Sequence, residues 1–422
     1  MSSPSRPAAV NQRRLHVLVL SQHFWPETFR INEVAESLRD AGCEVSALTG
    51  QPNYPDGAVF PGYRALAWGA QQHPAGYMVY RVPLVPRGRG GALKLVLNYL
   101  SFVVFGSLLG PWLLRKRRID VVFVYGTSPI LQAIVGIVLK RTHRARLVTW
   151  VQDLWPQSLE VTGYVRHPRA LAAVGAVVRW IYRHNDLLLV QSPAFRDSVR
   201  AMAPRTPVEV QPNPGERAFD DPAAAAPAAL LLPPGVNVVF AGNLGHAQAL
   251  DTVVQAARLL KHHAGVRIVL VGSGARAAWL VDVVRNEGLD NVLLTGRFPP
   301  EQMPGILAQA SALLVSLAKS PIMELTIPSK LQAYLAAGKP IIASVDGEGA
   351  RVVREAGAGL ACAAEDAQAL ADAVLSLCQM TADQREAMGR AGRAYYDQHF
   401  QPAALAEQLR ARFAALAVEN AA

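Results

Sequence analysis

The sequence has little cysteine and no paired acidic cluster of the kind that holds a metal. Its 422 residues include three cysteines, Cys43, Cys362 and Cys378, and no Cys-x-x-Cys spacing. They are too few for a disulfide scaffold and wrongly spaced for a structural zinc site. An Asp-x-Asp pair is also missing. We therefore expect a protein of the reducing cytoplasm that needs no metal and no cofactor.

Two further absences exclude other classes of protein. No Gly-x-Gly-x-x-Gly fingerprint follows the first expected strand, at residues 15–20, which counts against a nicotinamide dehydrogenase. The first fourteen residues are mostly polar and lack the apolar stretch of a secretory signal, so we expect a loose N-terminal tail. The net charge of +10 comes with short basic runs, such as 87–89 and 115–118, but with no nucleic-acid motif.

The sequence does contain enough apolar residues for two domains. Hydrophobic residues make up 51% of the chain, and apolar segments alternate with helical ones almost throughout. This alternation is typical of α/β proteins with doubly wound parallel sheets. Besides 15–20, followed by a helix at 27–41, strands are expected at 121–125, 147–151, 187–190 and 208–211, and in a second series at 236–241, 267–271, 292–295, 312–317 and 340–344.

The spacing of these segments predicts the domain organisation. A first domain is expected over residues 1–213 and a second over 236–395, joined by 214–235, which is rich in alanine and proline and has little capacity to form a core. Helices are expected at 382–399 and 405–418. The end of the chain, 396–422, either crosses back to the first domain or remains on the second.

Residues 95–114 form a long uncharged apolar segment, followed by the basic run 115–118. Its length raises the question of a membrane span, but Asn98, Gly106, Gly110 and Pro111 weaken that interpretation. An apolar helix beside Trp112 and a basic cluster suits docking of residues 92–118 into the interface of an anionic leaflet. The alternative is an ordinary core helix with a solvated basic end.

The most informative motif lies at residues 326–344, where Pro-Ser-Lys-Leu precedes a small-residue turn and Gly-Lys-Pro. Ser329 and Lys330 stand at an expected helix start, where backbone N–H groups and the helix dipole attract anions. The segment resembles the donor-sugar motif of the retaining glycosyltransferases of family 4. The nearest pattern is that of bacterial exopolysaccharide, O-antigen and colanic-acid enzymes, in the subgroup similar to N-acetylfucosaminyltransferases.

This resemblance implies a fold and an activity. The fold would be GT-B, with two Rossmann-like domains facing a central cleft. The activity would be metal-independent, retaining transfer of a sugar from a nucleotide diphosphate donor. The donor would be UDP-linked and carry an N-acetylated amino sugar, with N-acetylfucosamine as the first guess. The acceptor would be a polyprenyl-diphosphate-linked saccharide at the inner face of the plasma membrane, where the enzyme would be a peripheral protein of cell-surface polysaccharide biosynthesis.

The resemblance also places the donor site in the second domain. Gly242 and Asn243 would bring the main chain close to the diphosphate beside Lys330. Many relatives have arginine after the first glycine and a lysine five positions further on, where this chain has Asn243 and Gln248. The loops that would frame the nucleotide base carry Gly272, Gly274 and Arg297.

Family members typically carry two glutamates with seven residues between them, and this chain departs from that pattern. Ala333 stands where the second, ribose-binding glutamate is expected. Glu324 lies one residue away from the position of the first glutamate and is assigned a catalytic role facing the donor sugar. Gln332 or Glu348 is proposed to replace the missing ribose contact.

The acceptor side is expected in the first domain. Trp25 would stack on a sugar, and Glu27 and Thr28 belong to the same loop after the first strand; Glu27 is alternatively a first-turn residue favoured by the helix dipole. Asp153, between Trp150 and Trp155, is the first candidate for orienting the acceptor hydroxyl or stabilising charge at the anomeric carbon. Its alternative role is to cap the next helix.

Two other functions remain open from the sequence. One is a UDP-N-acetylglucosamine 2-epimerase, an isomerase of the same fold, which would need further acid and base groups in the cleft. The other is a non-catalytic membrane-bound scaffold, which the absence of arginine, lysine and glutamate at three family positions keeps open.

Overall fold

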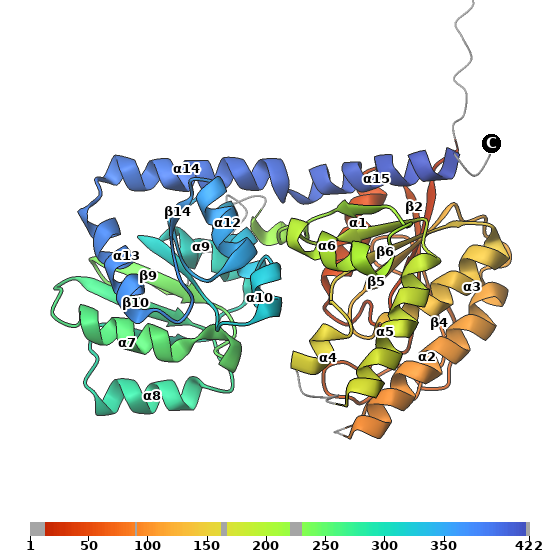
Figure 1. The fold of residues 1–422 in the computed structure, drawn as a ribbon, viewed down its shortest axis with the longest axis horizontal. Helices are drawn as coiled ribbons and strands as arrows, with labels where there is room; N and C mark the ends of the chain where they lie inside the picture. The colour runs from red at the N-terminus through yellow and green to blue at the C-terminus, as the bar shows by residue number, and fades with distance from the viewer. Residues whose placement is uncertain (1–12, 89–90, 162–166, 220–229, 419–422) are drawn as a thin grey trace, which may run out of the picture. The chain divides into compact units, whose positions relative to one another are not determined.

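The computed structural model describes residues 13–88, 91–161, 167–219 and 230–418, in two compact units (Figure 1). The first unit comprises Met1–Asp153, Ala176–Leu188 and Ala406–Ala422. The second comprises Leu154–Gly175 and Leu189–Leu405. Most of the expected N-terminal tail, Arg89 of the first basic run and the middle of the expected linker, at 220–229, lie outside the described residues.

An eight-stranded sheet has the order β3-β4-β2-β1-β5-β6-β7-β8. The pairs β1–β2, β2–β4, β1–β5 and β5–β6 are parallel, and β3 is antiparallel to β4. All five residues of β1 are buried, because strands covered on both faces are nearly continuous apolar runs. The strands are β1 (His16–Leu20), β2 (Glu44–Thr49), β3 (Gly69–Gln72), β4 (Met78–Arg81), β5 (Val121–Gly126), β6 (Arg146–Val151), β7 (Leu187–Val190) and β8 (Val208–Val210).

The second unit contains a six-stranded sheet of order β11-β10-β9-β12-β13-β14, in which all pairs are parallel. Apolar clusters cover both of its faces. The predicted α/β architecture of two Rossmann-like parallel-sheet domains is therefore confirmed. The strands are β9 (Val236–Ala241), β10 (Val266–Val271), β11 (Val292–Gly296), β12 (Ala312–Ser316), β13 (Ile341–Ser344) and β14 (Gly359–Cys362).

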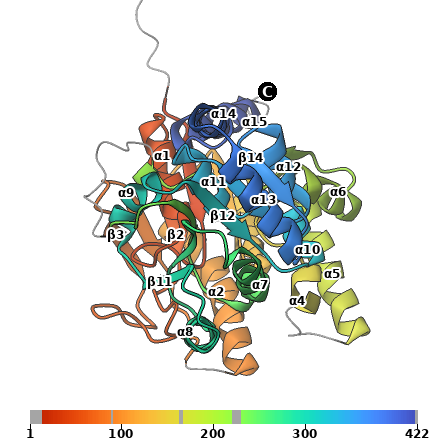
Figure 2. The ribbon, with the colours of Figure 1, turned by 90° about the vertical axis from the view of Figure 1, so that its left-hand side faces the viewer.

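The helices connect these strands. Those of the earlier part of the chain are α1 (Arg30–Asp40), α2 (Ala92–Leu113), α3 (Ala133–His143), α4 (Gln157–Val161), α5 (Pro168–Arg183) and α6 (Pro193–Met202). The later ones are α7 (Leu250–Leu260), α8 (Ala277–Asn286), α9 (Met303–Ala308), α10 (Pro321–Leu325), α11 (Ser329–Ala336), α12 (Gly347–Glu355), α13 (Ala367–Gln379), α14 (Ala382–His399) and α15 (Pro402–Val418). In the second unit, α7, α8 and α13 pack on one face of the sheet, and α9, α11 and α12 on the other (Figure 2).

Four strands, β2, β3, β4 and β14, were not expected from the sequence. β2 begins with exposed Glu44 and carries Ser46, and β3 has the polar sequence Gly-Ala-Gln-Gln at the edge of its sheet. β14 is a short edge strand whose residues are all partly buried. These strands lack the apolar run that identifies a central strand, and pairing with a neighbour defines them instead.

The chain after β8 differs from the expectation of a linker without core residues. Phe219, at the end of a 3-10 turn (Arg217–Phe219), is 4% exposed and belongs to a core cluster of the second unit. Arg393 donates a hydrogen bond to the Phe219 carbonyl at 3.2 Å, and Gln332 donates to the Asn213 carbonyl at 2.7 Å. Residues 213–219 are thus fixed to the second unit.

The last helix, α15, packs within the first unit. The rings of Phe413 and Phe123 lie 5.1 Å apart, and the Arg146 side chain donates to the Leu416 carbonyl at 3.0 Å. Phe413 is fully buried. Residues 406–418 therefore belong to the first unit although they follow the whole second unit in sequence.

Helix α2 has one buried and one exposed face. The buried face repeats every fourth residue, through Asn98, Phe102, Gly106 and Gly110. It is long and apolar enough to cross a membrane by length and composition, yet only 22% of its most apolar window is buried. Its exposed face is apolar along its whole length: Leu93, Val96, Leu97, Leu100, Val104, Leu108 and Trp112. We call these seven residues the apolar face of α2.

The glycines of α2 set how closely it packs on α3. A Cβ atom at Gly106 would lie 2.9 Å and 3.0 Å from the two Cγ atoms of Val135, which is too close for either side chain. Gly110 similarly faces Leu48 and Leu139. Small residues at this contact let the two helices approach closely.

We predict that Gly106→Val destabilises the fold by about 1–3 kcal/mol, because the added methyl groups overpack the contact between α2 and α3. Urea denaturation monitored by circular dichroism measures the change. Val104→Leu, at a position that is 51% exposed on the same helix, is the control and should stay within about 0.5 kcal/mol of wild type. Equal effects of the two substitutions would contradict this packing.

Candidate functional site

A cavity of about 650 Å³ opens in the second unit at the carboxyl ends of β9, β10 and β11. Such strand ends are where open α/β sheets bind ligands. The loops after these three strands and the start of α11 supply most of its lining. That lining comprises Glu216, Phe219, Ala241, Gly242, Asn243, Gln248, Val271, Gly272, Ser273, Gly274, Arg297, Phe298, Pro300, Met303, Leu307, Ser329, Lys330, Ala333 and Tyr334.

Two glycines bring the main chains of neighbouring loops into contact at one end of the cavity. Gly242 has φ +137° and Gly272 has φ +149°, in the region that favours glycine. A Cβ atom at Gly272 would lie 1.8 Å from the Gly242 carbonyl oxygen. No other residue fits there, and the wall at this point is bare backbone.

Lys330 supplies the positive charge of the cavity. Its Nζ lies 2.5 Å from Gln248 Oε1 and 3.7 Å from the centroid of the Phe240 ring. Burial lowers the pKa of Lys330 to about 7. No carboxylate forms an ion pair with Lys330 in the part of the chain that the structure describes. An anion in the cavity would therefore give this amine its missing partner and restore its charge.

The start of α11 adds to this preference for anions. The helix begins at Ser329, its first turn has no acidic residue, and Pro328 before it makes no side-chain cap. Ser329 is exposed beside Lys330 on the cavity wall. Helix-terminal N–H groups, a hydroxyl and an amine thus lie together, as binding of a phosphate requires.

Seven of the expected donor-site residues line this cavity: Gly242, Asn243, Gly272, Gly274, Arg297, Ser329 and Lys330. Three other expected residues do not. Gln332 is 2% exposed and its amide donates to the Asn213 carbonyl, while Glu348 is 7% exposed and paired with Arg351 at 2.8 Å. Glu324 is exposed on α10, outside the lining.

Glu216 and Phe219, which sequence reasoning did not identify, also line the cavity. Both belong to the segment expected to be a linker. The one signal in the sequence was that Phe219 stands in a segment rich in alanine and proline. A large aromatic ring in such a segment needs burial against a core. Ala333, at the position where relatives carry the ribose-binding glutamate, also lines the cavity. Glu216 is therefore the one carboxylate among the described residues of the lining.

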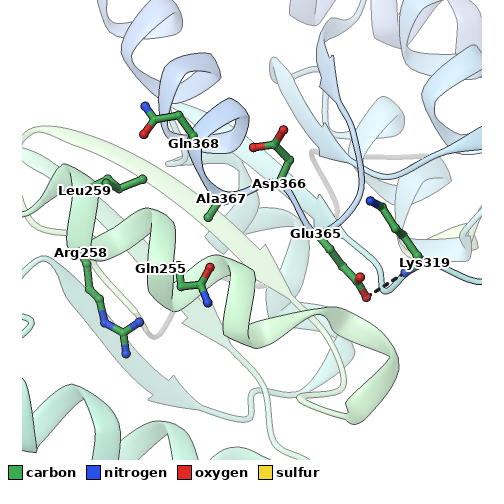
Figure 3. Close-up of a pocket in the computed structure, with 8 residues that line it drawn as sticks. All are labelled: Gln255, Arg258, Leu259, Lys319, Glu365, Asp366, Ala367 and Gln368. Carbon is green, nitrogen blue, oxygen red and sulfur yellow. Dashed lines mark hydrogen bonds between the residues drawn. The ribbon is translucent and has the colours of Figure 1, made fainter.

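A second hollow of the same unit, of about 600 Å³, has none of the expected site residues in its lining (Figure 3). Gln255 and Arg258 come from α7, and Asp366 to Gln368 from the start of α13. Glu365 accepts a hydrogen bond from the Lys319 backbone N–H at 3.0 Å. Charges of both signs are mixed here, so this hollow has no clear preference for an anion.

In the first unit, Glu27 is turned inward. It is 2% exposed, and its Oε1 accepts from the backbone N–H groups of Asn53 and Tyr54 at 2.7 Å each. The His23 ring lies 3.2 Å from both carboxylate oxygens. Glu27 thus ties the loop after β1 to the loop after β2 and does not face outward to an acceptor.

The neighbours of Glu27 remain accessible. Trp25 is partly buried and meets the His73 ring edge-on, with centroids 5.0 Å apart. Thr28 is exposed. Of the three residues expected on the acceptor side, Trp25 and Thr28 are therefore the ones that a ligand could reach.

Asp153 lies after the end of β6 and is held by the loop after β5. Its Oδ2 accepts from the Ser128 backbone N–H at 2.8 Å and from the Ser128 hydroxyl at 2.9 Å. Burial, with a contribution from the charge of Asp153, raises the pKa of Tyr125 to about 12. The next helix begins at Gln157, so Asp153 does not cap it.

The described residues contain no group of three or more His, Cys, Asp and Glu side chains arranged to hold a metal ion.

Two family models match the chain. The model described as "Glycosyl transferase 4-like domain" matches residues 28–214, and the model described as "Glycosyl transferases group 1" matches residues 235–380. The first match contains Asp153. The second contains the glycine loops and Lys330. Together the two matches cover most of the chain.

Two curated relatives have names related to the same activity. A probable glycosyltransferase, WbjE of Pseudomonas aeruginosa, is 28% identical over 63% of this chain and 68% of its own length. A putative colanic acid biosynthesis glycosyl transferase, WcaI of Escherichia coli K12, is 26% identical over 77% of this chain and 82% of its own length.

Solved structures share the fold. Sucrose-phosphate synthase from Thermosynechococcus elongatus has a TM-score of 0.72 at 19% identity, covering 96% of this chain and 100% of that one. HepE of Anabaena, solved in complex with UDP, has a TM-score of 0.65 at 14% identity, covering 96% and 100%. Together with the two family models, these matches show that the chain is an enzyme, a glycosyltransferase of family 4 with the GT-B fold.

Proposed function

We propose that this enzyme transfers a sugar, with retention of anomeric configuration and without a metal, from a UDP-linked donor to a lipid-linked saccharide during synthesis of a cell-surface polysaccharide. The observation that carries the proposal is Lys330, an amine without a carboxylate partner in a cavity with a glycine-lined backbone wall. Two relatives point to the same chemistry: one is named for colanic acid biosynthesis, and one was solved with UDP.

The donor would bind in the second unit with its diphosphate at the Lys330 end. The Gly242 and Gly272 N–H groups donate to the Val271 and Gly296 carbonyls, so the donors to the phosphate oxygens would come from the residues that follow these glycines in the two loops and from the first turn of α11. The apolar side chains of Phe298, Met303 and Leu307 offer a wall for a nucleotide base. By resemblance, the transferred group is an N-acetylated amino sugar.

In the chemical step, the bond from the anomeric carbon to the diphosphate oxygen breaks and a bond to the acceptor hydroxyl oxygen forms. The hydroxyl proton leaves with the diphosphate. Negative charge grows on the leaving group, so the positive charge of Lys330 stabilises the transition state more than the ground state. Asp153, fixed by Ser128, would orient the acceptor hydroxyl and stabilise the developing positive charge of the sugar.

An isomerase of the same fold has less support. A 2-epimerase needs acid and base groups beside the donor sugar, but the described lining of the cavity has one carboxylate, Glu216, and no histidine. The scaffold alternative, which lacks catalysis, leaves the cavity and Lys330 without a role.

We also propose that the enzyme is cytoplasmic and docks on the inner leaflet of the plasma membrane through α2. The apolar face of α2 would enter the leaflet, and Lys94 and Arg115 lie near its two ends. Trp112 meets Trp68 edge-on at 5.1 Å, and Arg115 lies over the Trp112 ring at 4.1 Å. Indoles and guanidinium groups beside an apolar face suit the headgroup region of an anionic leaflet.

For Lys330, we predict a dependence of UDP binding on pH. In the empty protein Lys330 loses its proton near pH 7, so binding of UDP above that pH must take up a proton. The affinity for UDP should be highest below pH 7 and fall as the pH rises, by up to about tenfold per pH unit. Isothermal titration calorimetry from pH 6.5 to 9 measures this. Lys330→Gln should bind weakly at every pH with a flat profile, while Lys339→Gln keeps the wild-type slope; an unchanged slope in Lys330→Gln would contradict the assignment.

For Asp153, we predict that Asp153→Asn lowers kcat by roughly 100-fold or more and changes the affinity for UDP less than about twofold. Asparagine keeps an oxygen that can accept from Ser128, so the loop should hold its shape. Release of UDP from the donor in the presence of a bacterial membrane-lipid extract gives kcat. Asp290→Asn, an exposed aspartate of the second unit, serves as the control. If Asp153→Asn lowers the affinity for UDP as much as it lowers kcat, Asp153 has a structural role instead.

For docking, we predict that Leu100→Glu lowers binding to vesicles of anionic phospholipid at least tenfold in a flotation assay, because a carboxylate would enter the apolar layer. Leu100 is 46% exposed, and Leu259 on α7 is equally exposed, so Leu259→Glu is a matched control that should bind as wild type does. If both variants float with the vesicles like wild type, α2 is not the docking element.

A further inference from the structure

We propose that the phosphorylated saccharide head of the lipid acceptor binds in a hollow of about 470 Å³ at the outer edge of the first sheet. The hollow is lined by Gln51, Arg81 and residues of the segment 62–71. None of them was assigned a role from the sequence. This inference rests on the proposed function, since it names the acceptor site of that same reaction.

The topology of the sheet places this hollow at the edge where ligands bind. β2 and β4 are parallel, so Gln51 after β2 and Arg81 at the end of β4 lie at the same edge. β3 runs the opposite way and pairs Gly69 with Arg81, which brings the segment before β3 to that edge as well. Arg81 donates to the Gly50 carbonyl at 2.8 Å and also to the Trp25 carbonyl. The hollow therefore adjoins the loop that carries Trp25.

The lining has the chemistry of a phosphorylated sugar site. It contains two guanidinium groups, Arg64 and Arg81, the amides of Gln51 and Gln71, and the rings of Tyr63 and Trp68. No carboxylate is among the described residues that line it. Guanidinium groups suit phosphate oxygens, amides suit sugar hydroxyls, and aromatic rings suit the apolar face of a sugar.

Arg81 gives the hollow a buried positive charge in a fixed position. Arg81 is only 4% exposed, and its guanidinium donates to two backbone carbonyls and lies 4.9 Å from the centroid of the Tyr63 ring. No ion pair to Arg81 occurs within the described ranges. Burial lowers the pKa of Arg81, and the nearby Tyr63 and Glu27 offset only part of that desolvation, so an anion in the hollow would add to the compensation. Arg64 is exposed at the rim and free to close on such a ligand.

The hollow is continuous with the proposed docking element. Trp68, which lines the hollow and is 52% exposed, contacts Trp112 at the end of the apolar face of α2. Leu66, two residues before Trp68, is 72% exposed. A ligand with an apolar tail and an anionic sugar head would place its tail along α2 and its head among Arg64, Tyr63 and Gln71. A free sugar phosphate would use only half of this surface.

The test is binding of geranyl diphosphate-linked N-acetylglucosamine to the full-length protein. Hydrogen–deuterium exchange should show protection of residues 62–72 on addition of this probe. Arg64→Ala should weaken binding of the probe at least tenfold and leave the affinity for UDP unchanged. Arg285→Ala, which removes an exposed arginine from α8 in the second unit, should change neither.

Two further probes separate the sources of binding. N-Acetylglucosamine 1-phosphate, without the prenyl group, should bind more weakly and still protect residues 62–72, and inorganic phosphate should not protect them. Equal protection by inorganic phosphate would make the hollow a general anion site and overturn the proposal. The proposal is also wrong if the wild-type protein does not bind the geranyl probe, or if Arg64→Ala binds it like wild type while UDP binding and donor turnover persist. Failure to bind any nucleotide would instead count against the proposed function itself.

Discussion

The close approach of two backbone turns, at Gly242 and Gly272, is the constraint on which the cavity of the second unit depends. The Gly242 carbonyl lies where any side chain at position 272 would have to be, so the two loops after β9 and β10 meet as bare main chain. Lys330 and the start of α11 border the same cavity, to which these two loops contribute main chain without side chains at the glycines. An amine in such a setting loses charge when the cavity is empty and regains it with an anionic ligand.

The first unit uses buried charge differently. Glu27 satisfies its carboxylate with backbone N–H groups and fixes two loops, while Arg81, at the end of β4, donates to backbone carbonyls. The charge of Glu27 offsets part of the desolvation of Arg81, yet burial still lowers the pKa of the guanidinium. Glu27 thus gives this sheet edge its shape, and Arg81, compensated only in part, gives it a preference for negative ligands.

How far the sequence predicted this molecule depended on the physical signal available. Fully buried strands such as β1 and β9 are apolar runs, and they were recognised almost residue for residue. The edge strands β3 and β14 carry no such run, since one side of an edge strand needs no partner. The motif around Lys330 was recognisable because glycine, proline and lysine have local backbone and charge requirements.

The sites show the same division. Lys330 and the glycine loops line one cavity, as a donor site there would need, whereas Gln332 and Glu348 are buried outside its lining. On α11, a shift of one residue decides whether a side chain lines the cavity or is buried in the interior. The spacing of residues in the sequence does not reveal which side of the helix faces the cavity. Glu216, Arg64 and Arg81 were missed because their roles come from contacts between segments far apart in the chain.

The anchoring of residues 213–219 has a consequence for engineering. Domain exchange between related transferases is a natural way to recombine donor and acceptor preferences, and the alanine- and proline-rich stretch near 235 would look like the obvious junction. A cut there would separate Glu216 and Phe219 from the cavity that they help to enclose. A junction placed before Asn213 would keep Glu216 and Phe219 in the same piece of chain as the rest of the cavity. The junction for a domain exchange in this protein should therefore be chosen from the packing contacts and not from the amino-acid composition of the segment.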